Sequence, residues 1–143
     1  MTVSEMAPAR AAFTPAHQRL VLIDDDPAFA RIMQEFARSR GVALDTYSSL
    51  ADMGGIGRLR RYAAAIVDHD LGTTINGVEV AEYLPTMFAG LSMVLISSRT
   101  RTPEPGRPWP KSIARFVHKD LGPDAILDAA LAARSHRSIR RLS

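Results

Sequence analysis

The sequence of 143 residues contains no cysteine. This absence excludes disulfide bonds, a thiol nucleophile and any metal site with cysteine ligands. The sequence also lacks an apolar run long enough to cross a bilayer, and residues 1–19 lack the continuous apolar segment of a signal peptide. We therefore expect a cytoplasmic protein without a membrane segment.

Length and composition fit a single folded domain with short additions at both ends. A domain commonly holds about 100–200 residues, and 46% hydrophobic residues are enough to fill a core. We expect a flexible N-terminal arm at 1–18, one domain at 19–135 and a basic C-terminal tail at 136–143. The formal net charge of the chain is +3, and three of its arginines, Arg137, Arg140 and Arg141, lie in this tail. Such a tail can bind nucleic acid, an anionic membrane or an acidic partner, although most basic helix ends are simply solvated.

Continuous apolar runs alternate with helical patterns along the chain. The runs predict five buried strands, at about 19–24, 42–47, 62–67, 92–96 and 114–117. The apolar residues in these strands are mostly continuous and do not alternate with polar ones. They therefore predict an α/β fold with a five-stranded parallel sheet, doubly wound and covered by helices on both faces.

Helical spacing of apolar residues marks three longer segments, at 27–40, 78–88 and 123–137. The apolar face of the first segment consists of Phe29, Ile32, Met33, Phe36 and Ala37. A short helix, capped by Ser48 or Ser49, is expected after the second strand.

Three consecutive carboxylates, Asp24, Asp25 and Asp26, follow the first strand, and Pro27 comes next. Like charges side by side repel one another, and a fold tolerates them where a hard cation such as Mg²⁺ lies among them. Asp26 before a proline also suits the N-cap of a helix, which explains that residue but not the whole run. The run therefore predicts an acidic site for Mg²⁺ at the end of the first strand.

Polar side chains also follow three later strands. Asp68, Ser97 and Lys119 each come at the end of an apolar run. In a doubly wound sheet the carboxyl ends of the strands meet at one edge, where ligands bind. Carboxylates can hold Mg²⁺ and one of them can accept a phosphoryl group, while a hydroxyl and an ammonium can bind phosphoryl oxygens. The set therefore indicates phosphoryl transfer.

Four stretches, in this order, resemble the response-regulator receiver domain of two-component signalling: VLIDDDP, AAAIVDHDLG, VLISS and FVHKD. The resemblance covers about residues 19–135 and implies a flavodoxin-like receiver architecture. It also implies a single-domain response regulator that uses Mg²⁺ and receives a phosphoryl group from a histidine kinase or a histidine phosphotransfer protein. Such a domain switches the binding of a partner and turns over no external substrate. We expect no DNA-binding domain, while the downstream partner and a homodimer are left open.

The resemblance assigns roles to the acidic residues. Asp68 matches the phosphoacceptor aspartate. Asp24 and Asp25 match the acidic pair, with Asp25 as a direct ligand of Mg²⁺ and Asp24 acting through a water molecule. Asp70 stands where the family donates a backbone carbonyl to the metal.

Three further matches concern the response to phosphorylation. Ser97 matches the switch hydroxyl that closes on the phosphoryl group, Lys119 matches the lysine that pairs with its oxygens, and Phe116 matches the aromatic switch position. The family usually has proline after this lysine, often with a cis peptide bond, but Asp120 stands there. A cis bond before a residue other than proline costs about 2.5–4 kcal/mol, so we expect a trans bond or a reshaped turn. Gly72 likewise stands where the family usually has a proline, four residues after the phosphoacceptor.

Asp70 and Arg99 support a further hypothesis. Asp70 lies two residues after Asp68, and Arg99 lies two residues after Ser97. We expect the two side chains to face each other and to restrict the hydrolytic water, which would prolong the life of the phosphoryl group. The alternative is an exposed ion pair worth about 0–1 kcal/mol.

Two other functions stay open at this stage. The stretch from Asp68 to Thr73 resembles the nucleophile motif of haloacid-dehalogenase-type phosphatases, with Asp68 as nucleophile and Asp70 as general acid or base. That family places its metal-binding acidic pair downstream of the nucleophile, whereas the acidic run here lies upstream. The other alternative is a phosphorylation-independent binding module that uses the arginine-rich C-terminus, 134–141.

Overall fold

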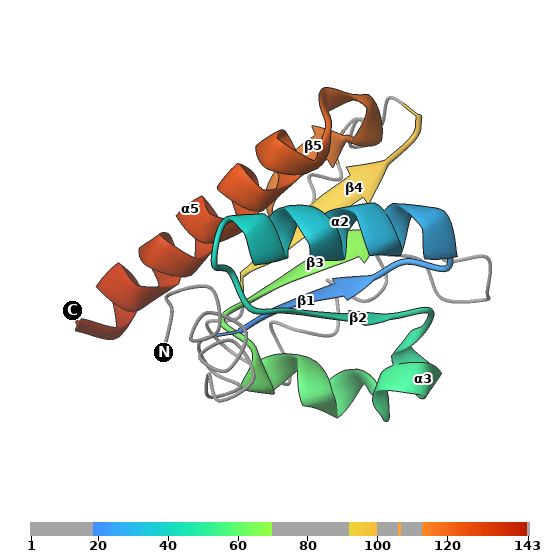
Figure 1. Ribbon diagram of the computed structural model, residues 1–143. Helices are drawn as coiled ribbons and strands as arrows, with labels where there is room; N and C mark the ends of the chain where they lie inside the picture. Colours follow the sequence, from blue (N-terminus) through green and yellow to red (C-terminus); the bar gives the residue numbers. More distant parts are fainter. Residues whose placement is uncertain (1–18, 70–91, 100–105, 107–112, 143) are drawn as a thin grey trace, which may run out of the picture.

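The computed structural model describes residues 19–69, 92–99, 106 and 113–142 of the chain (Figure 1). Four sequence predictions lie outside these described residues: the N-terminal arm at 1–18, the helix at 78–88, and the roles of Asp70 and Gly72. Among the residues that are described, no helix is both long enough and apolar enough to cross a membrane.

Five parallel strands form one sheet in the order β2-β1-β3-β4-β5. In chain order they are β1 (Leu20–Ile23), β2 (Leu44–Tyr47), β3 (Ala64–Asp68), β4 (Met93–Ser97) and β5 (Ile113–His118). The α/β fold with a five-stranded parallel sheet is therefore confirmed. The chain adds β2 on one side of β1 and the later strands on the other, so the strand order reverses between β1 and β3. In open α/β sheets, ligands bind outside the carboxyl ends of the strands at such a switch point.

Helical segments cover both faces of the sheet (Figure 1). They are α2 (Pro27–Ser39), α3 (Leu50–Met53), the 3₁₀ segments η2 (Ile56–Arg61) and η3 (Lys119–Leu121), and α5 (Pro123–Leu142). The helices α2 and α5 pack on one face, and α3 and η2 pack on the other. This arrangement is the doubly wound architecture that the apolar strands predict.

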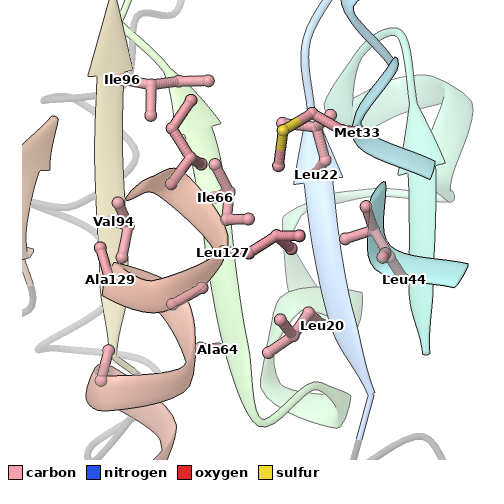
Figure 2. Packing of buried hydrophobic residues seen from close by; sticks show 14 of the residues in the cluster. Leu20, Leu22, Met33, Leu44, Ala64, Ile66, Val94, Ile96, Leu127 and Ala129 are labelled. Carbon is pink, nitrogen blue, oxygen red and sulfur yellow. The ribbon is translucent and has the colours of Figure 1, made fainter. Parts of the chain in front are cut away.

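The hydrophobic core is divided by the sheet into two clusters. Leu20 and Leu22 of β1 pack beneath α2 and α5, as Figure 2 shows, while Val21 and Ile23 pack beneath α3 and η2. Successive side chains of a strand point to opposite faces. All four residues of β1 are fully buried, so the first strand is anchored on both sides and holds the residues that follow it in place.

The start of α2 agrees with its sequence signals. The Asp26 carboxylate accepts hydrogen bonds from the backbone N–H groups of Ala28 at 3.0 Å and Phe29 at 3.3 Å. Pro27 occupies the first turn, where its missing N–H leaves no donor unsatisfied. The role of Asp26 as an N-cap is thus confirmed.

The apolar face predicted for α2 is only partly buried. Met33 and Ala37 are buried, but Ile32 and Phe36 are 43% and 38% exposed. Each exposed residue directly precedes a buried one, so it lies about 100° around the helix from the buried stripe, at 3.6 residues per turn. Spacing alone does not determine which edge of an apolar face contacts the sheet.

The last helix is longer than expected. The sequence predicts an end near residue 137, but α5 continues to Leu142. Residues 138–142 contain no glycine or proline, and their two arginines favour a helix. Part of the segment that was expected to be a separate basic tail is therefore helical, while its binding role stays a prediction.

A polar group ties the starts of three strands together. The Asp45 carboxylate in β2 accepts a hydrogen bond from the Tyr62 hydroxyl at 2.8 Å and forms an ion pair with Arg19 at 2.5 Å. Burial, followed by the hydrogen bond to Asp45, raises the pKa of Tyr62 well above its usual range. The group lies at the opposite end of the strands from the predicted site and has a structural role.

Candidate acidic phosphoryl-transfer site

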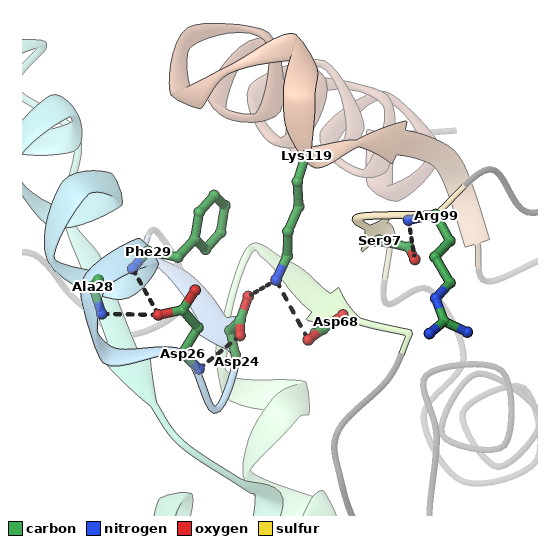
Figure 3. Close-up of polar contacts among 8 residues, drawn as sticks. All are labelled: Asp24, Asp26, Ala28, Phe29, Asp68, Ser97, Arg99 and Lys119. Atoms are coloured by element: carbon green, nitrogen blue, oxygen red, sulfur yellow. Dashed lines mark hydrogen bonds and ion pairs between the residues drawn. The ribbon is translucent and has the colours of Figure 1, made fainter.

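The polar residues predicted from the strand ends lie at one edge of the sheet (Figure 3). Asp24 directly follows β1, Asp68 is the last residue of β3, Ser97 is the last residue of β4, and Lys119 directly follows β5. All five strands are parallel, so these positions share the carboxyl edge, on both sides of the switch point between β1 and β3.

Three carboxylates form the centre of the site. Asp24, Asp25 and Asp68 each offer an oxygen, and these oxygens lie within 4.8 Å of one another. The side chains of Asp24 and Asp68 are 0% and 8% exposed, while Asp25 is exposed. Buried carboxylates at this separation repel one another unless a cation lies among them.

The two oxygens of Asp24 have different surroundings. Oδ1 accepts a hydrogen bond from the backbone N–H of Asp26 at 2.9 Å. Oδ2 is buried, and among the described residues its one close polar contact is the Lys119 ammonium, 2.7 Å away. A buried carboxylate oxygen with an unused lone pair, close to two further carboxylates, fits the all-oxygen ligand set that Mg²⁺ prefers.

Lys119 bridges two of the carboxylates. Its Nζ lies 2.7 Å from Asp24 Oδ2 and 3.5 Å from Asp68 Oδ2, as Figure 3 shows. Burial lowers the pKa of Lys119, but the hydrogen bond and charge of Asp24, together with the charge of Asp68, outweigh burial and raise that pKa above its usual value. The lysine is therefore charged at neutral pH, and the three carboxylates with one ammonium leave two negative charges, which one divalent cation would balance.

Two neighbours of Lys119 were not recognised in the sequence. The ring centroid of Phe29, in the first turn of α2, lies 4.7 Å from Nζ, within the range of a cation–π contact. Nδ1 of His118 accepts a hydrogen bond from the backbone N–H of Asp120 at 3.1 Å, just beyond the lysine. No sequence motif predicts either contact, because the helical spacing of Phe29 indicates a core residue and His118 stands at the expected end of a strand.

The peptide bond between Lys119 and Asp120 is trans, since the described residues contain no cis peptide bond. The expected departure from the usual lysine–proline turn is therefore present, and it takes the form of the 3₁₀ segment η3. Lys119 nevertheless reaches both Asp24 and Asp68 from this turn.

Ser97 is completely buried at the end of β4. Its hydroxyl oxygen accepts a hydrogen bond from the backbone N–H of Arg99 at 3.0 Å. A hydroxyl that accepts at its oxygen still has its own proton to donate, which suits contact with a phosphoryl oxygen. Arg99 thus contacts Ser97 through its main chain, while its expected partner Asp70 lies outside the described residues.

Phe116, the predicted aromatic switch, lies in the middle of β5, opposite Leu95 of β4. Its side chain is half-buried. Phe116 is therefore on the strand that ends at Lys119 but not at the carboxyl edge itself, and its switching role stays a prediction.

A groove of about 440 Å³ adjoins the acidic cluster, between the start of α2 and the ends of β1 and β2. Asp24 and Asp25 line one end of it, and Arg31, Tyr47 and Ser48 line other parts. Arg31 and Tyr47 were not predicted from the sequence, and Ser48 was predicted only as a possible helix cap. Their signal was available, because Tyr47 and Ser48 also stand at the carboxyl end of a strand.

Comparisons with known proteins agree with this geometry. The family model described as "Response regulator receiver domain" matches residues 20–131. No curated protein matches the sequence. Among solved structures, similar chains include the response regulator StyR (20% identity, 87% of this chain and 62% of that chain, TM-score 0.70). They also include a CheY-like receiver domain protein from Methanospirillum hungatei JF-1 (13% identity, 86% and 98%, TM-score 0.68). A third is the signal receiver domain of an HD domain-containing protein from Pseudomonas fluorescens Pf-5 (13% identity, 90% and 94%, TM-score 0.70). At these identities the structural likeness shows the fold alone.

Proposed function

The chain belongs to the response regulator receiver domain family, and we propose that it is a Mg²⁺-dependent phosphoacceptor that is phosphorylated on Asp68. The observation that carries the proposal is the meeting of Asp24, Asp25 and Asp68 within 4.8 Å, with the Lys119 ammonium among them. The phosphoryl donor would be a histidine kinase or a histidine phosphotransfer protein, encountered in the cytoplasm.

The surroundings of the carboxylates favour Asp68 as the acceptor over Asp24. The Asp24 side chain is 0% exposed, accepts a hydrogen bond from a backbone N–H through Oδ1 and lies 2.7 Å from Lys119. The Asp68 side chain is 8% exposed, and its contact with Lys119 is longer, at 3.5 Å. Of these two buried carboxylates, Asp68 is the more accessible to a phosphoryl donor.

In the proposed transfer, an Asp68 carboxylate oxygen attacks the phosphorus atom of a phosphohistidine. A P–O bond forms, the P–N bond breaks, and the imidazole of the donor leaves and takes up a proton. Asp24, Asp25 and Asp68 would hold Mg²⁺, which, when bound, would neutralise the oxygens of the incoming phosphoryl group. Lys119 and the Ser97 hydroxyl would donate hydrogen bonds to those oxygens.

The consequence of phosphorylation would be a change in partner binding. Movement of Lys119 and Ser97 toward the phosphoryl group would shift the population of surfaces on β4 and β5, including Phe116. The output could be a separate protein or a second copy of this chain. Family membership supports this signalling function over the phosphatase alternative, and we expect no turnover of an external substrate.

The test is phosphorylation by phosphoramidate, measured by intact mass, with and without Mg²⁺. We expect one phosphoryl group on the wild type, none without Mg²⁺ and none on Asp68→Asn. Asp26→Asn is the matched control, because it removes a carboxylate from the same acidic run while asparagine keeps the helix cap. A folded wild type that gains no phosphoryl group would overturn the proposal, and turnover of a generic phosphomonoester would then favour the phosphatase alternative.

A further inference from the structure

The turn that carries Lys119 differs from the lysine–proline turn that the family resemblance implies. The Lys119–Asp120 bond is trans, and η3 replaces a turn built around proline. We propose that His118 is the positioning residue for Lys119, because its imidazole caps η3 and thereby holds the backbone from which Lys119 reaches the acidic cluster. This role of His118 presupposes the phosphoacceptor function proposed for Asp68.

The replacement of proline by Asp120 creates a hydrogen-bond donor that needs a partner. Proline has no backbone N–H, whereas Asp120 has one, and it lies in the first turn of a helix, where N–H groups lack helical partners. Nδ1 of His118 accepts from this N–H at 3.1 Å. His118 has extended backbone angles (φ −72°, ψ 134°), which are typical of an N-cap residue. The imidazole of His118, directly before the lysine, therefore accepts the hydrogen bond of the Asp120 backbone N–H, directly after the lysine.

The cap completes a turn that is held on both sides of Lys119. On one side, His118 pairs with Ser97 in the ladder between β4 and β5. On the other, the backbone N–H of Gly122 donates to the carbonyl of Lys119 at 3.1 Å, and Gly122 has a φ of +94° that favours glycine. The His118 cap joins the first of these points to Asp120, directly after the lysine, so loss of the cap would release the part of the backbone that carries Lys119.

A fixed backbone matters for this side chain because lysine is long and flexible. Its four-carbon stem must be ordered for Nζ to lie 2.7 Å from Asp24 and 3.5 Å from Asp68. Freedom in the turn would add to the freedom of the stem. The ammonium would then spend less time where it can pair with a phosphoryl group on Asp68.

Three substitutions separate capping from packing. His118→Ala removes the ring and the acceptor, His118→Leu keeps the bulk without an acceptor, and His118→Asn supplies a side-chain oxygen that caps well. We expect phosphorylation by phosphoramidate to be slowed about fivefold in the alanine and leucine variants, in line with the usual value of a cap, and restored to within about twofold in the asparagine variant. Mg²⁺ affinity should not fall in any of the three, because the carboxylates are held by β1 and β3 and a displaced ammonium competes less with the metal.

A second measurement tests the cap without phosphorylation. Amide hydrogen exchange at Asp120 should be faster in His118→Ala and His118→Leu and should return to the wild-type rate in His118→Asn. If neither the wild type nor any variant is phosphorylated, the function proposed for Asp68 fails. The exchange rates at Asp120 would still show whether the His118 cap exists. The positioning role of His118 would be overturned if His118→Leu were phosphorylated and exchanged its Asp120 amide at the wild-type rates. It would also be overturned if His118→Asn were phosphorylated as slowly as His118→Leu.

Discussion

Replacement of Lys119 by methionine should destabilise the folded protein, because the ammonium is the cation beside two buried carboxylates. At an effective dielectric constant of about 20, unit charges 2.7 Å apart, as Lys119 and Asp24 are, attract by about 6 kcal/mol. Desolvation offsets much of this attraction, and removal of one partner from a buried pair commonly costs about 3–5 kcal/mol. Since the Lys119 side chain is 16% exposed, we expect a loss near the lower end, about 3 kcal/mol of unfolding free energy.

Urea unfolding at neutral pH, in EDTA and again with Mg²⁺, measures this loss. The difference between Lys119→Met and wild type should be about 3 kcal/mol in EDTA and smaller with Mg²⁺, because a metal bound by the carboxylates stabilises the variant more than the wild type. Arg115→Met, which removes an exposed positive charge from β5, is the control and should have little effect. An equal unfolding free energy for Lys119→Met and wild type in EDTA would refute the view that the ammonium stabilises the acidic cluster.

Three further predictions concern groups around the site and in the core. Phe29→Leu keeps an apolar side chain but removes the aromatic ring that lies against the Lys119 ammonium. The pKa of Lys119, followed by NMR, should therefore be lower in this variant than in the wild type. An unchanged pKa would show that the ring does not stabilise the charge. The pKa of the Tyr62 hydroxyl is raised in the folded state, so above about pH 10 the folded protein keeps the hydroxyl proton while the unfolded chain loses it. The free energy of unfolding should therefore fall above about pH 10, by about 1.4 kcal/mol per pH unit. Tyr62→Phe should remove that part of the alkaline slope in urea unfolding, and an identical slope in both proteins would contradict the assignment. Asp26→Ala should cost about 1 kcal/mol of unfolding free energy through loss of the helix cap, whereas Asp26→Asn should cost less than about 0.5 kcal/mol; equal losses would mean that the carboxylate charge, not the cap, matters.

The sheet and the placement of the polar residues at its edge could be predicted because both depend on local patterns. The three central strands, β1, β3 and β4, are buried along their whole length, so each is a largely apolar run that ends where the sheet ends. Asp24, Asp68 and Ser97 come at the ends of these three runs, and Lys119 directly follows β5, two residues after Val117. Parallel strand direction then brings the four residues to one edge whatever the details of the loops.

Contacts between distant parts of the chain could not be predicted in the same way. Phe29 has the spacing of a core residue, and nothing in its neighbourhood indicates that its ring contacts Lys119, ninety residues later in the sequence. The rotation of α2 about its axis, which leaves Ile32 and Phe36 exposed, depends on how α2 packs against the sheet and α5. Arg40, at the end of α2, likewise contacts Asp128 of α5 at 2.6 Å, a contact that only the folded arrangement reveals.

The position of Lys119 gives an electrostatic reason for the proposed requirement for Mg²⁺. The ammonium lies closer to Asp24, at 2.7 Å, than to Asp68, at 3.5 Å. To pair with phosphoryl oxygens on Asp68 it must move away from Asp24, whose carboxylate is 0% exposed. A buried carboxylate that loses its cation is strongly destabilised, and the phosphoryl group adds further negative charge to the same edge. Transfer to Asp68 without a second cation at the acidic cluster would therefore be opposed both by the incoming phosphoryl group and by the carboxylate that Lys119 leaves behind.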